Sequence, residues 1–436
     1  MINCDWKIVT KAHANRLKCI LNTIIQPDQT AGIPGRSIRD NQWATRDILE
    51  YGYQTNTPGA IVALDAEKAF DRVNHPFLIK VLEKLGFGPN FVKMVKTILT
   101  NNKTMALNNG YLSSEIPIQR GTRQGCPISA YLYVIVAETL AIAIRKEVSV
   151  VGYPRPPGST GKTKVSLYAD DTINYLDAKP TTLKRSLIAL SRILAIYQSA
   201  SGSKINDSKT EIIHFGSKDP NRAATNTRAF LVDSDLPIKY WTVKSIDLGF
   251  RSLGITYKRS LAKTHEANYA KCALALKDKI AFLSLRQLSI KGRSMALKTQ
   301  ALSLLWSTAA VVPLSSSGSL AGEGLGISNE KLKEIAGLAN KYIWSSLGAS
   351  PTTLAQTTLQ KPYQQGGLNT FDIGIQAESL LMSQLTGILD PSNNRSSVVY
   401  ARFWFAKNKD FYGLEVNDNS DLSFLNKYNH TEKIQV

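Results

Sequence analysis

Residues 163–176 read TKVSLYADDTINYL, an apolar, strand-forming stretch whose centre holds two adjacent carboxylates. Successive side chains of a strand point to opposite faces of a sheet, so two neighbouring acids fit badly in one continuous strand. A tight hairpin with residues 169–172 at its tip removes the conflict and exposes at least one carboxylate. The pattern therefore predicts two short strands joined near Asp170 and Asp171, although the pair alone is more typical of an ordinary surface turn.

A second apolar run, GAIVALD at residues 59–65, has the length of a strand and ends on Asp65. Residues 66–85 then show the apolar spacing of a helix and stop before a glycine. If the two strands are neighbours, Asp65 converges with the acids of the predicted hairpin. Grouped carboxylate oxygens suit Mg²⁺, and two such ions support an in-line displacement that releases pyrophosphate.

The composition is that of a basic globular protein of 436 residues. It has 53 Lys and Arg against 34 Asp and Glu, a net charge of +19 and a pI of about 9.6, with 43% hydrophobic residues. This predicts two to three domains and a polyanionic partner, with nucleic acid first and an anionic membrane surface second. Four scattered cysteines without Cys-x-x-Cys spacing exclude a disulfide scaffold and a recognisable zinc site, and they suit a reducing compartment.

Positive charge is concentrated in residues 239–298, which hold thirteen Lys or Arg against three Asp or Glu. This net +10 is about half of the excess of the whole chain. Apolar residues recur at helical spacing in the same window, which predicts a pair of amphipathic helices with basic outer faces, broken around Gly292. Lysines and arginines often only solvate a helix surface, but an excess of this size favours a surface that faces phosphates.

Two other stretches differ from the rest of the chain. Residues 128–144 are mostly apolar, yet they are shorter than the about 20 that a bilayer needs and contain Glu138, so we expect a buried core helix. Residues 315–326 are rich in Ser and Gly and predict a flexible connection. Beyond about residue 390 the sequence is polar and shows only weak periodicity.

Several motifs occur in the order of one known family. Residues 64–71, LDAEKAFD, resemble the first catalytic motif of reverse transcriptases, and residues 168–171, YADD, resemble the second. Between them, RGTRQGCPIS at residues 120–129 resembles the substrate-positioning motif. SGSKINDSKT at residues 201–210 looks like the motif that follows, and residues 248–255 look like the primer-grip strand pair.

More narrowly, the chain is similar to the non-LTR (LINE-type) retrotransposon enzymes of animals. The similarity rests on ANRL at residues 14–17, IPGRS at 33–37 and GTRQG at 121–125. SIKGR at residues 289–293 and QGGL at 365–368 are similar to the thumb and post-thumb regions of that family. The resemblance covers residue 1 to about residue 390.

The resemblance implies an α+β right-hand polymerase fold, with fingers, a palm built on an antiparallel sheet, a helical thumb and a helical C-terminal connector. It implies fingers and palm in residues 1–215, a linker in 216–240 and the thumb in 241–313. A post-thumb connector would follow in residues 314–390, and residues 391–436 form an unassigned tail.

The implied reaction is RNA-directed DNA synthesis, in which the primer 3′-oxygen attacks the α-phosphorus of a dNTP. The resemblance makes Asp65, Asp170 and Asp171 the catalytic carboxylates and the ligands of two Mg²⁺ ions, with Mn²⁺ as a substitute. It makes Lys209, with Lys204 second, the proton donor to pyrophosphate. A lysine in a polar loop is just as often only solvated.

The same resemblance assigns contacts to the incoming nucleotide. Phe70 would be the gate that excludes a ribose 2′-hydroxyl, although ordinary helix packing also explains this ring. Gln124 and Gly125 would lie against the nucleotide and templating base, with Arg123 near phosphates, while a Gly-Cys-Pro sequence also suits the start of a helix. The remaining implied contacts are Ala66 and Arg36 for the substrate, and Leu253, Gly254, Lys291 and Arg293 for nucleic acid. Plain turns explain the glycines beside Arg36 and Leu253 equally well.

The chain also departs from the family pattern. The family usually has Gly then Phe where this chain has Ala31 and Gly32, a change expected to loosen the fingers. The chain starts within the first fingers motif, with no endonuclease domain before it and no Cys/His knuckle after it, so we expect an N-terminally truncated piece of an element.

The expected partners are an RNA template, a DNA primer and dNTPs, with no membrane. The expected compartment is intracellular, either nucleus or cytoplasm, and the oligomeric state is open. Two alternatives stand beside a reverse transcriptase. One is a catalytically inactive or domesticated remnant that binds RNA, and the other is an RNA-directed RNA polymerase. Phe70 at the gate position speaks against the second alternative.

Overall fold

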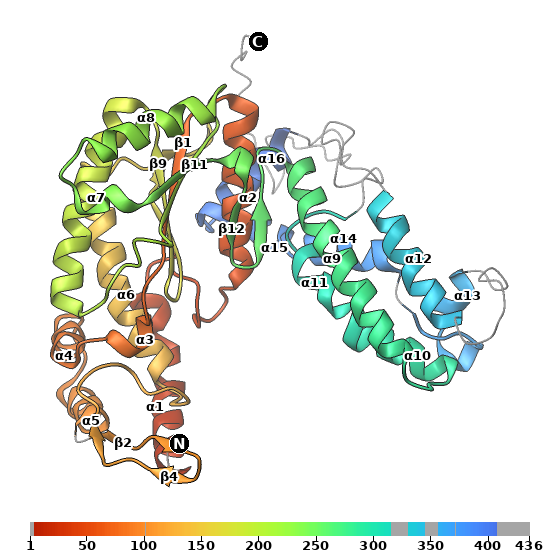
Figure 1. Cartoon of the computed structure of the whole chain (residues 1–436), viewed down its shortest axis with the longest axis horizontal. Helices are drawn as coiled ribbons and strands as arrows, with labels where there is room; N and C mark the ends of the chain where they lie inside the picture. The colour runs from red at the N-terminus through yellow and green to blue at the C-terminus, as the bar shows by residue number, and fades with distance from the viewer. Residues whose placement is uncertain (1–3, 101, 315–329, 345–355, 371, 408–436) are drawn as a thin grey trace. The chain divides into compact units, whose positions relative to one another are not determined.

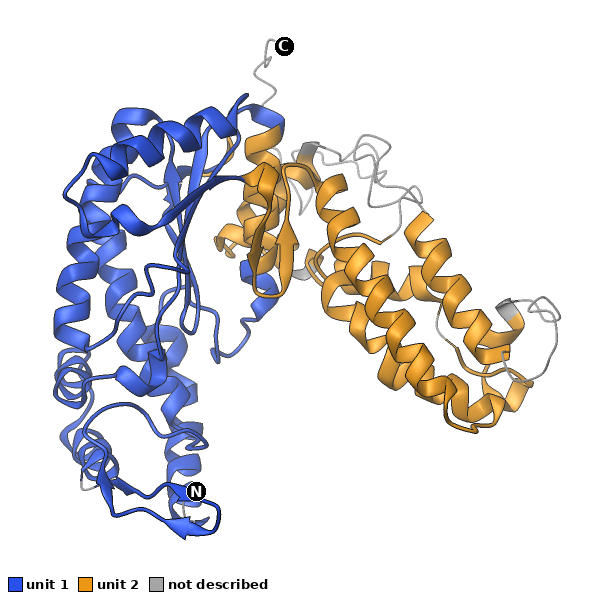
Figure 2. Ribbon diagram, viewed as in Figure 1, with its two compact units in different colours: residues 1–41, 54–155, 160–245 blue, residues 42–53, 156–159, 246–436 orange. Residues whose placement is uncertain are grey.

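The computed structural model describes residues 4–100, 102–314, 330–344, 356–370 and 372–407. The chain forms two compact units, shown in different colours in Figure 2. Unit 1 consists of residues 1–41, 54–155 and 160–245, and unit 2 of residues 42–53, 156–159 and 246–436.

Unit 1 is built on a five-stranded sheet with the strand order β11-β10-β1-β9-β8. The strands are β1 (Gly59–Leu64), β8 (Val165–Tyr168), β9 (Asp171–Asp177), β10 (Glu211–Phe215) and β11 (Thr242–Ser245). All neighbours pair antiparallel except β10 and β11, which are parallel. The predicted antiparallel sheet therefore needs one correction, because a helical crossover between β10 and β11 returns the chain in the same direction.

The helical elements of unit 1 are α1 (Cys4–Ile24), the ends of α2 (Ile38–Thr55), α3 (Ala69–Arg72), α4 (His75–Lys84), α5 (Pro89–Leu99), α6 (Ser129–Lys146), α7 (Pro180–Ser201), α8 (Pro220–Val232) and the 3₁₀ turn Pro237–Tyr240. Of these, α6, α7 and α8 pack against the strands and lie on one side of the sheet (Figure 1). Alternate strand residues Ala60, Val62, Leu176 and Ile212 face these helices and are fully buried in the main core. Three pairs of two-residue strands complete the unit: β2 (Lys103–Thr104) with β5 (Ile116–Pro117), β3 (Leu107–Asn108) with β4 (Tyr111–Leu112), and β6 (Tyr153–Pro154) with β7 (Lys162–Thr163).

Helix α6 is the buried core helix that the apolar run predicted. Eleven of its residues are buried, including Glu138, whose side chain is bonded by the guanidinium of Arg145. Arg145 also pairs with Asp28, with Nη1 2.6 Å from Oδ1. None of the described helices is long and apolar enough to cross a membrane.

Two predictions for unit 1 are wrong in detail. The helix expected over residues 66–85 is two helices, because Asn74 adopts an extended conformation and caps α4, its Oδ1 accepting the Phe77 amide at 3.0 Å. The segment 216–240, expected to be a linker, contains α8 and packs it against β10 and β11. The apolar face of α8, with Ala224 and Leu231 buried, accounts for this packing.

Unit 2 is mostly helical and contains one β-hairpin, β12 (Phe250–Ser252) with β13 (Ile255–Tyr257). Its helical elements are residues 42–53 of α2, the 3₁₀ turn Ile246–Leu248, α9 (Leu261–Ser284), α10 (Ile290–Ala296), a π-helical segment Leu297–Ala301, α11 (Ser303–Ala309), α12 (Glu330–Trp344), α13 (Gln356–Gln360), the 3₁₀ turn Tyr363–Gln365, α14 (Ile373–Met382), α15 (Leu385–Leu389) and α16 (Ser396–Lys407). The indole Nε1 of Trp43 donates to the Ala310 carbonyl at 2.8 Å, which ties α2 to the end of α11.

The predicted pair of basic helices is present as α9 and α10, but the break is not at Gly292. The chain leaves α9 after Ser284 and restarts at Ile290, where Ser289 caps α10 by accepting the Gly292 amide. A serine cap fixes the start of the helix before the glycine, so the glycine lies inside the first turn. The Ser- and Gly-rich segment 315–326 and the end of the predicted tail lie outside the described residues.

Candidate active site

The three candidate carboxylates meet where the strands of unit 1 end. In the pairing of β1 with β9, Leu64 lies opposite Thr172, so Asp65 follows the strand directly beside Asp171. Tyr168 pairs with Asp171 across the β8–β9 hairpin, which leaves Ala169 and Asp170 as the two-residue turn. The structure thus confirms the hairpin and brings the two sequence motifs together.

The backbone of this turn is unusual for its sequence. Ala169 has φ +55°, a left-handed conformation that residues with a Cβ rarely adopt. The amide of Ala169 donates to Oε1 of Gln29 at 3.2 Å, and the same oxygen accepts the amide of Ala31 at 3.0 Å. Gln29 is fully buried, so its carboxamide fixes the turn beside Asp170 from within the protein. A role for Gln29 was not predicted; the only sequence signal was a glutamine beside the departure at Ala31.

The carboxylates influence one another electrostatically. Desolvation by the surrounding protein raises the pKa of Asp171, and the negative charges of Asp170 and Asp65 raise this pKa further. Burial also raises the pKa of the Tyr133 hydroxyl, with smaller contributions from Tyr197, Asp170 and Asp171. Over the part of the chain that the structure describes, no three His, Cys, Asp or Glu side chains form a ready metal-binding group. The mutual repulsion nevertheless fits a site whose carboxylates face a cation.

The loop of residues 201–210 holds the segment around Asp65 through its backbone. The amide of Asn206 donates to the Asp65 carbonyl at 2.7 Å, and the Asp65 amide donates to Oγ1 of Thr210 at 3.3 Å. Ala66 forms a β-bridge with Ile205. These bonds fix the backbone of Asp65 through both its amide and its carbonyl group.

The two candidate lysines of this loop have different surroundings. Nζ of Lys204 lies 3.0 Å from Oε2 of Glu67, and this ion pair lowers the pKa of the Glu67 carboxyl. Lys209 is exposed and follows Asn206 in the same turn, since its amide donates to the Asn206 carbonyl at 3.2 Å. Because Lys204 already has a carboxylate partner, Lys209 is the better candidate proton donor.

The glycine loop at residues 120–125 packs directly on α3. The Gly121 amide donates to the Val73 carbonyl and the Thr122 amide to the Phe70 carbonyl, both at 2.8 Å. Gly121 has φ +87°, and a Cβ there would lie 2.7 Å from the carbonyl oxygen of Asp71. Only glycine permits this approach, so the loop is glycine-dependent for a steric reason.

The candidate substrate contacts lie on both sides of this junction. Phe70 stacks on Tyr133 of α6, with ring centroids 4.2 Å apart and an interplanar angle of 30°. Gln124 is exposed, with Nε2 3.5 Å from Oδ1 of Asp71, and the guanidinium of Arg123 donates to the Asn102 side chain. Tyr133 was not predicted as part of the site, because its motif neighbours are aliphatic and the whole run was assigned to the core.

Arg36 does not have the surroundings predicted for it. Its Nη1 donates to the carbonyls of Gln26 and Gln29, the latter at 2.7 Å, and its Nη2 donates to the Ile25 carbonyl at 2.9 Å. These bonds satisfy the backbone at the end of α1, where helix carbonyls lack intrahelical partners. These bonds give Arg36 a structural role, and its contact with the triphosphate stays a prediction.

In unit 2, the residues predicted to contact nucleic acid differ in their exposure to solvent. Leu253 and Gly254 form the two-residue turn of the β12–β13 hairpin, with φ values of +49° and +86°. Lys291 is exposed and lies over the ring of Tyr363, 4.5 Å from its centroid. Arg293 is only 8% exposed and its Nη1 donates to the Ile343 carbonyl at 3.4 Å, so its predicted nucleic-acid contact is replaced by packing of α10 against α12.

This fold and this arrangement of carboxylates are those expected of the class of template-dependent polymerases. The chain belongs to the reverse transcriptase family, because the model described as reverse transcriptase (RNA-dependent DNA polymerase) matches residues 1–283. The predicted right-hand polymerase fold is thereby confirmed at the level of the family.

The similar proteins are encoded by retrotransposable elements, as the LINE-type motifs predicted. An uncharacterized 149 kDa protein of transposon TX1 from Xenopus laevis is 36% identical over 220 residues, which is 50% of this chain and 16% of that protein. The Pol polyprotein of the type-2 element R2DM from Drosophila melanogaster is 26% identical over 167 residues, 38% of this chain and 15% of that protein. The chain thus spans about a sixth of the length of these relatives.

Two telomerase structures are also similar. Apo telomerase from Candida tropicalis has a TM-score of 0.42 and 11% identity over 96% of this chain and 61% of that chain. Telomerase from Candida albicans, in complex with a fragment of telomeric RNA, has a TM-score of 0.37 and 9% identity over 87% of this chain and 54% of that chain.

Proposed function

We propose that this chain catalyses RNA-directed DNA synthesis and extends a DNA primer with deoxynucleoside triphosphates on an RNA template. The observation that supports this most directly is the position of Asp65 beside the hairpin that carries Asp170 and Asp171. Desolvation and the charges of Asp170 and Asp65 raise the pKa of Asp171, and carboxylates that repel one another in this way favour a cation as their ligand.

The donor set fits Mg²⁺, with Mn²⁺ as a substitute, because carboxylate oxygens are hard ligands. Asp65 and Asp170 would hold the two ions, with Asp171 as the third ligand. When bound, these ions supply activation of the primer hydroxyl and neutralisation of charge on the leaving pyrophosphate.

Phe70 would select deoxynucleotides. Its ring stacks on Tyr133, which is 4% exposed, so the ring cannot easily move away from a ribose 2′-hydroxyl. A packed neighbour makes this exclusion steric, and a steric gate discriminates more strongly than a movable side chain does.

The remaining site residues would position the triphosphate. Arg123 would face the phosphates, while Gln124, Gly125 and the backbone at Ala66 would lie along the nucleotide. Lys209, exposed in its loop, would hold the proton that the leaving pyrophosphate takes up.

In unit 2, the turn at Leu253 and Gly254 would hold the primer terminus. The carbonyl of Leu253 accepts a bond from the Gln42 side chain at 2.8 Å, which fixes the turn. Lys291 would contact a backbone phosphate from the basic face of α10. An intracellular compartment, nucleus or cytoplasm, goes with these substrates.

Primer extension on an RNA template with Mg²⁺ tests the proposal. The wild-type chain is expected to extend a DNA primer with dNTPs, and Asp170→Asn is expected to stop extension. Asp177→Asn is the matched control, because Asp177 lies at the other end of β9 and the amide oxygen can still accept the Lys179 amide. Extension that survives Asp170→Asn would show that the site is wrongly assigned.

A second comparison separates the two alternatives. Phe70→Val is expected to admit rNTPs, while the wild type prefers dNTPs. A wild type that prefers rNTPs would indicate an RNA-directed RNA polymerase. Template binding without any extension, in Mg²⁺ or Mn²⁺, would instead indicate an RNA-binding remnant.

A further inference from the structure

Unit 1 contains a second pocket, remote from the carboxylates, between α7, α8 and strand β10. Its volume is about 430 Å³, within the range of sites for small ligands. His214 lies opposite Ala60 in the β1–β10 pairing, whereas Asp65 follows Leu64, so the two sites lie at opposite ends of β1. Asp65 is five residues along the chain from Ala60, which corresponds to about 17 Å of extended strand.

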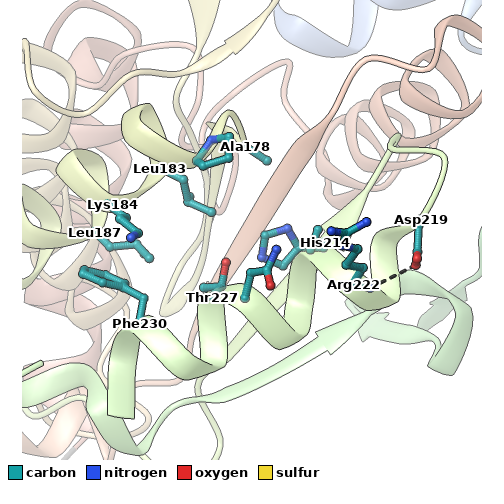
Figure 3. A pocket seen from close by; sticks show the side chains of 12 residues that line it. Ala178, Leu183, Lys184, Leu187, His214, Asp219, Arg222, Thr227 and Phe230 are labelled. Carbon is teal, nitrogen blue, oxygen red and sulfur yellow. Dashed lines mark hydrogen bonds between the residues drawn. The ribbon is translucent and has the colours of Figure 1, made fainter. Parts of the chain in front are cut away.

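The inner part of the pocket is mostly apolar, and its buried polar side chains are His214 and Thr227. Leu183 and Leu187 are 3% and 0% exposed, and His214 is 2% exposed. Figure 3 shows the imidazole of His214 among the side chains that line the pocket. Neither ring nitrogen of His214 has a hydrogen-bond partner within the described structure. A buried polar group without a partner costs free energy, so its position at a pocket points to a ligand that completes its bonds.

The chemistry of this histidine is that of a neutral ring. Burial lowers the pKa of His214 to about 4, so the imidazole is uncharged at neutral pH. A neutral imidazole offers one N–H donor and one acceptor nitrogen. The edges of nucleobases carry donors and acceptors side by side and match such a ring within an apolar pocket.

The rim of the pocket is positive. Lys184 and Arg222 are exposed lining residues, and Nζ of Lys184 is held over the ring of Phe230, 5.0 Å from its centroid. Asp219 is the lining acid, and its Oδ1 is occupied by the Arg222 amide at 2.9 Å, which caps α8. The first turns of α7 and α8 both contribute to the wall, so the positive ends of two helix dipoles add to the two side-chain charges.

We infer that this pocket binds a nucleoside monophosphate, either free or as one unit of a single strand. The base enters the apolar part and pairs its edge with His214, and the phosphate remains at the basic rim, whose two cations, Lys184 and Arg222, lie at opposite ends of the pocket (Figure 3). The site is separate from the proposed polymerase centre, lies at the other end of the sheet, and requires no metal ion.

Nuclear magnetic resonance of the histidine side chains tests this inference in the presence of EDTA. The chain has five histidines, so the His214 ring signal can be assigned with the variant His214→Gln. Titration with AMP, GMP, CMP and UMP is expected to shift that signal for at least one nucleotide. No shift with any of the four, up to about 5 mM, would overturn the inference.

Variants at the rim separate this site from other basic surfaces. Arg222→Ala and Lys184→Ala should each weaken binding of the nucleotide severalfold, because each removes a positive charge from the rim that attracts the phosphate. Arg185→Ala is the matched control, since Arg185 is an exposed cation on α7 outside the pocket. Equal binding by all three variants would contradict the assignment, even if His214→Gln failed to fold.

Two further titrations define the ligand. Inorganic phosphate alone should not shift the His214 signal, and a phosphate that displaces the nucleotide at equal concentration would exclude a nucleoside site. A short single-stranded oligonucleotide that shifts the same signal at lower concentration would identify a strand as the source. Asp170→Asn should bind the nucleotide as the wild type does, so failure of the polymerase proposal and failure of this one are distinguishable.

Discussion

The two ends of the sheet in unit 1 have opposite electrostatic character. At one end, Asp65, Asp170 and Asp171 gather negative charge where strands β1 and β9 meet. At the other end, a neutral and buried His214 lies beneath a rim that carries Lys184 and Arg222. The two sites are separated along strand β1, with Ala60 opposite His214 and Asp65 directly after the other end of the strand. A single sheet can therefore carry a proposed cation site and a proposed anion site at its two ends.

The largest expected effect is a loss of activity at the acidic end alone. Asp65→Asn should reduce primer extension by about a thousandfold or more, because one of the proposed metal-binding charges is lost. The same variant should leave nucleotide binding at the His214 pocket unchanged. Rates of extension and the His214 resonance, measured on one protein sample, check both halves. Parallel losses would show that the two ends are not independent.

Two glycines of the loop at residues 120–125 provide the next comparison. Gly121→Ala should lower the free energy of unfolding by about 3 kcal/mol, because the new Cβ meets the Asp71 backbone and the residue keeps a positive φ. Gly125→Ala is the matched control, with φ +79° but open space around its Cβ, and should cost about 1 kcal/mol. Urea denaturation measures both values.

A substitution at the other end of β1 shows whether a loss of stability there also lowers primer extension. A Cβ on Gly59 would lie 2.2 Å from Cζ of Phe215, so Gly59→Ala should also destabilise the protein. Assayed well below its midpoint of unfolding, Gly59→Ala should keep normal extension, whereas Gly121→Ala should not. Equal activity of the two variants would mean that the glycine loop does not position the site.

The pH dependence of stability should reveal the titration of Glu138, the buried carboxyl group of α6. Burial is the largest cause that raises the pKa of Glu138 to about 7, well above the 4.5 of an exposed glutamate. The folded state therefore binds a proton more tightly than the unfolded state does, so stability falls as the pH rises through this range. The expected loss between pH 5.5 and 8 is about 2 kcal/mol. Glu138→Gln should flatten this dependence, and an unchanged slope would assign it to other groups.

The smallest expected effect concerns the basic helices of unit 2. Lys291→Ala should weaken RNA binding a fewfold and reduce the salt slope by about one, because one phosphate contact is lost. Arg293→Ala should instead lower stability, since this guanidinium is buried and bonded to the backbone. A salt slope changed only by Arg293→Ala would reverse the assignment of the two residues.

The site residues that the sequence predicted best are those fixed by local pattern. The length of the apolar run predicts a strand that ends on Asp65, and the alternation of side chains along a strand predicts a turn at Asp170. The structure pairs strand β1 with strand β9 of that hairpin. The break before α10 was predicted at Gly292, because glycine disfavours a helix interior. The boundary is instead set by Ser289, whose side chain caps α10.

The contacts that the sequence could not predict join distant segments. Arg36 bonds to carbonyls at the end of α1, and nothing in a Pro-Gly-Arg sequence distinguishes this use from a phosphate contact. Tyr133 reaches Phe70 only because α6 packs against α3 and α4 in three dimensions. His214 lies in the sequence EIIHF, and nothing in this run indicates that both nitrogens of its ring lack a partner within the described residues.

One carboxamide oxygen, Oε1 of Gln29, accepts the amides of both Ala31 and Ala169. The two amide protons are therefore shielded from solvent by the same acceptor, although 138 positions separate them in the chain. They should exchange with deuterium together, in a single opening event that also frees the peptide preceding Asp170. Hydrogen exchange at these two alanines would thus measure how often the carboxylate turn comes loose in the folded protein.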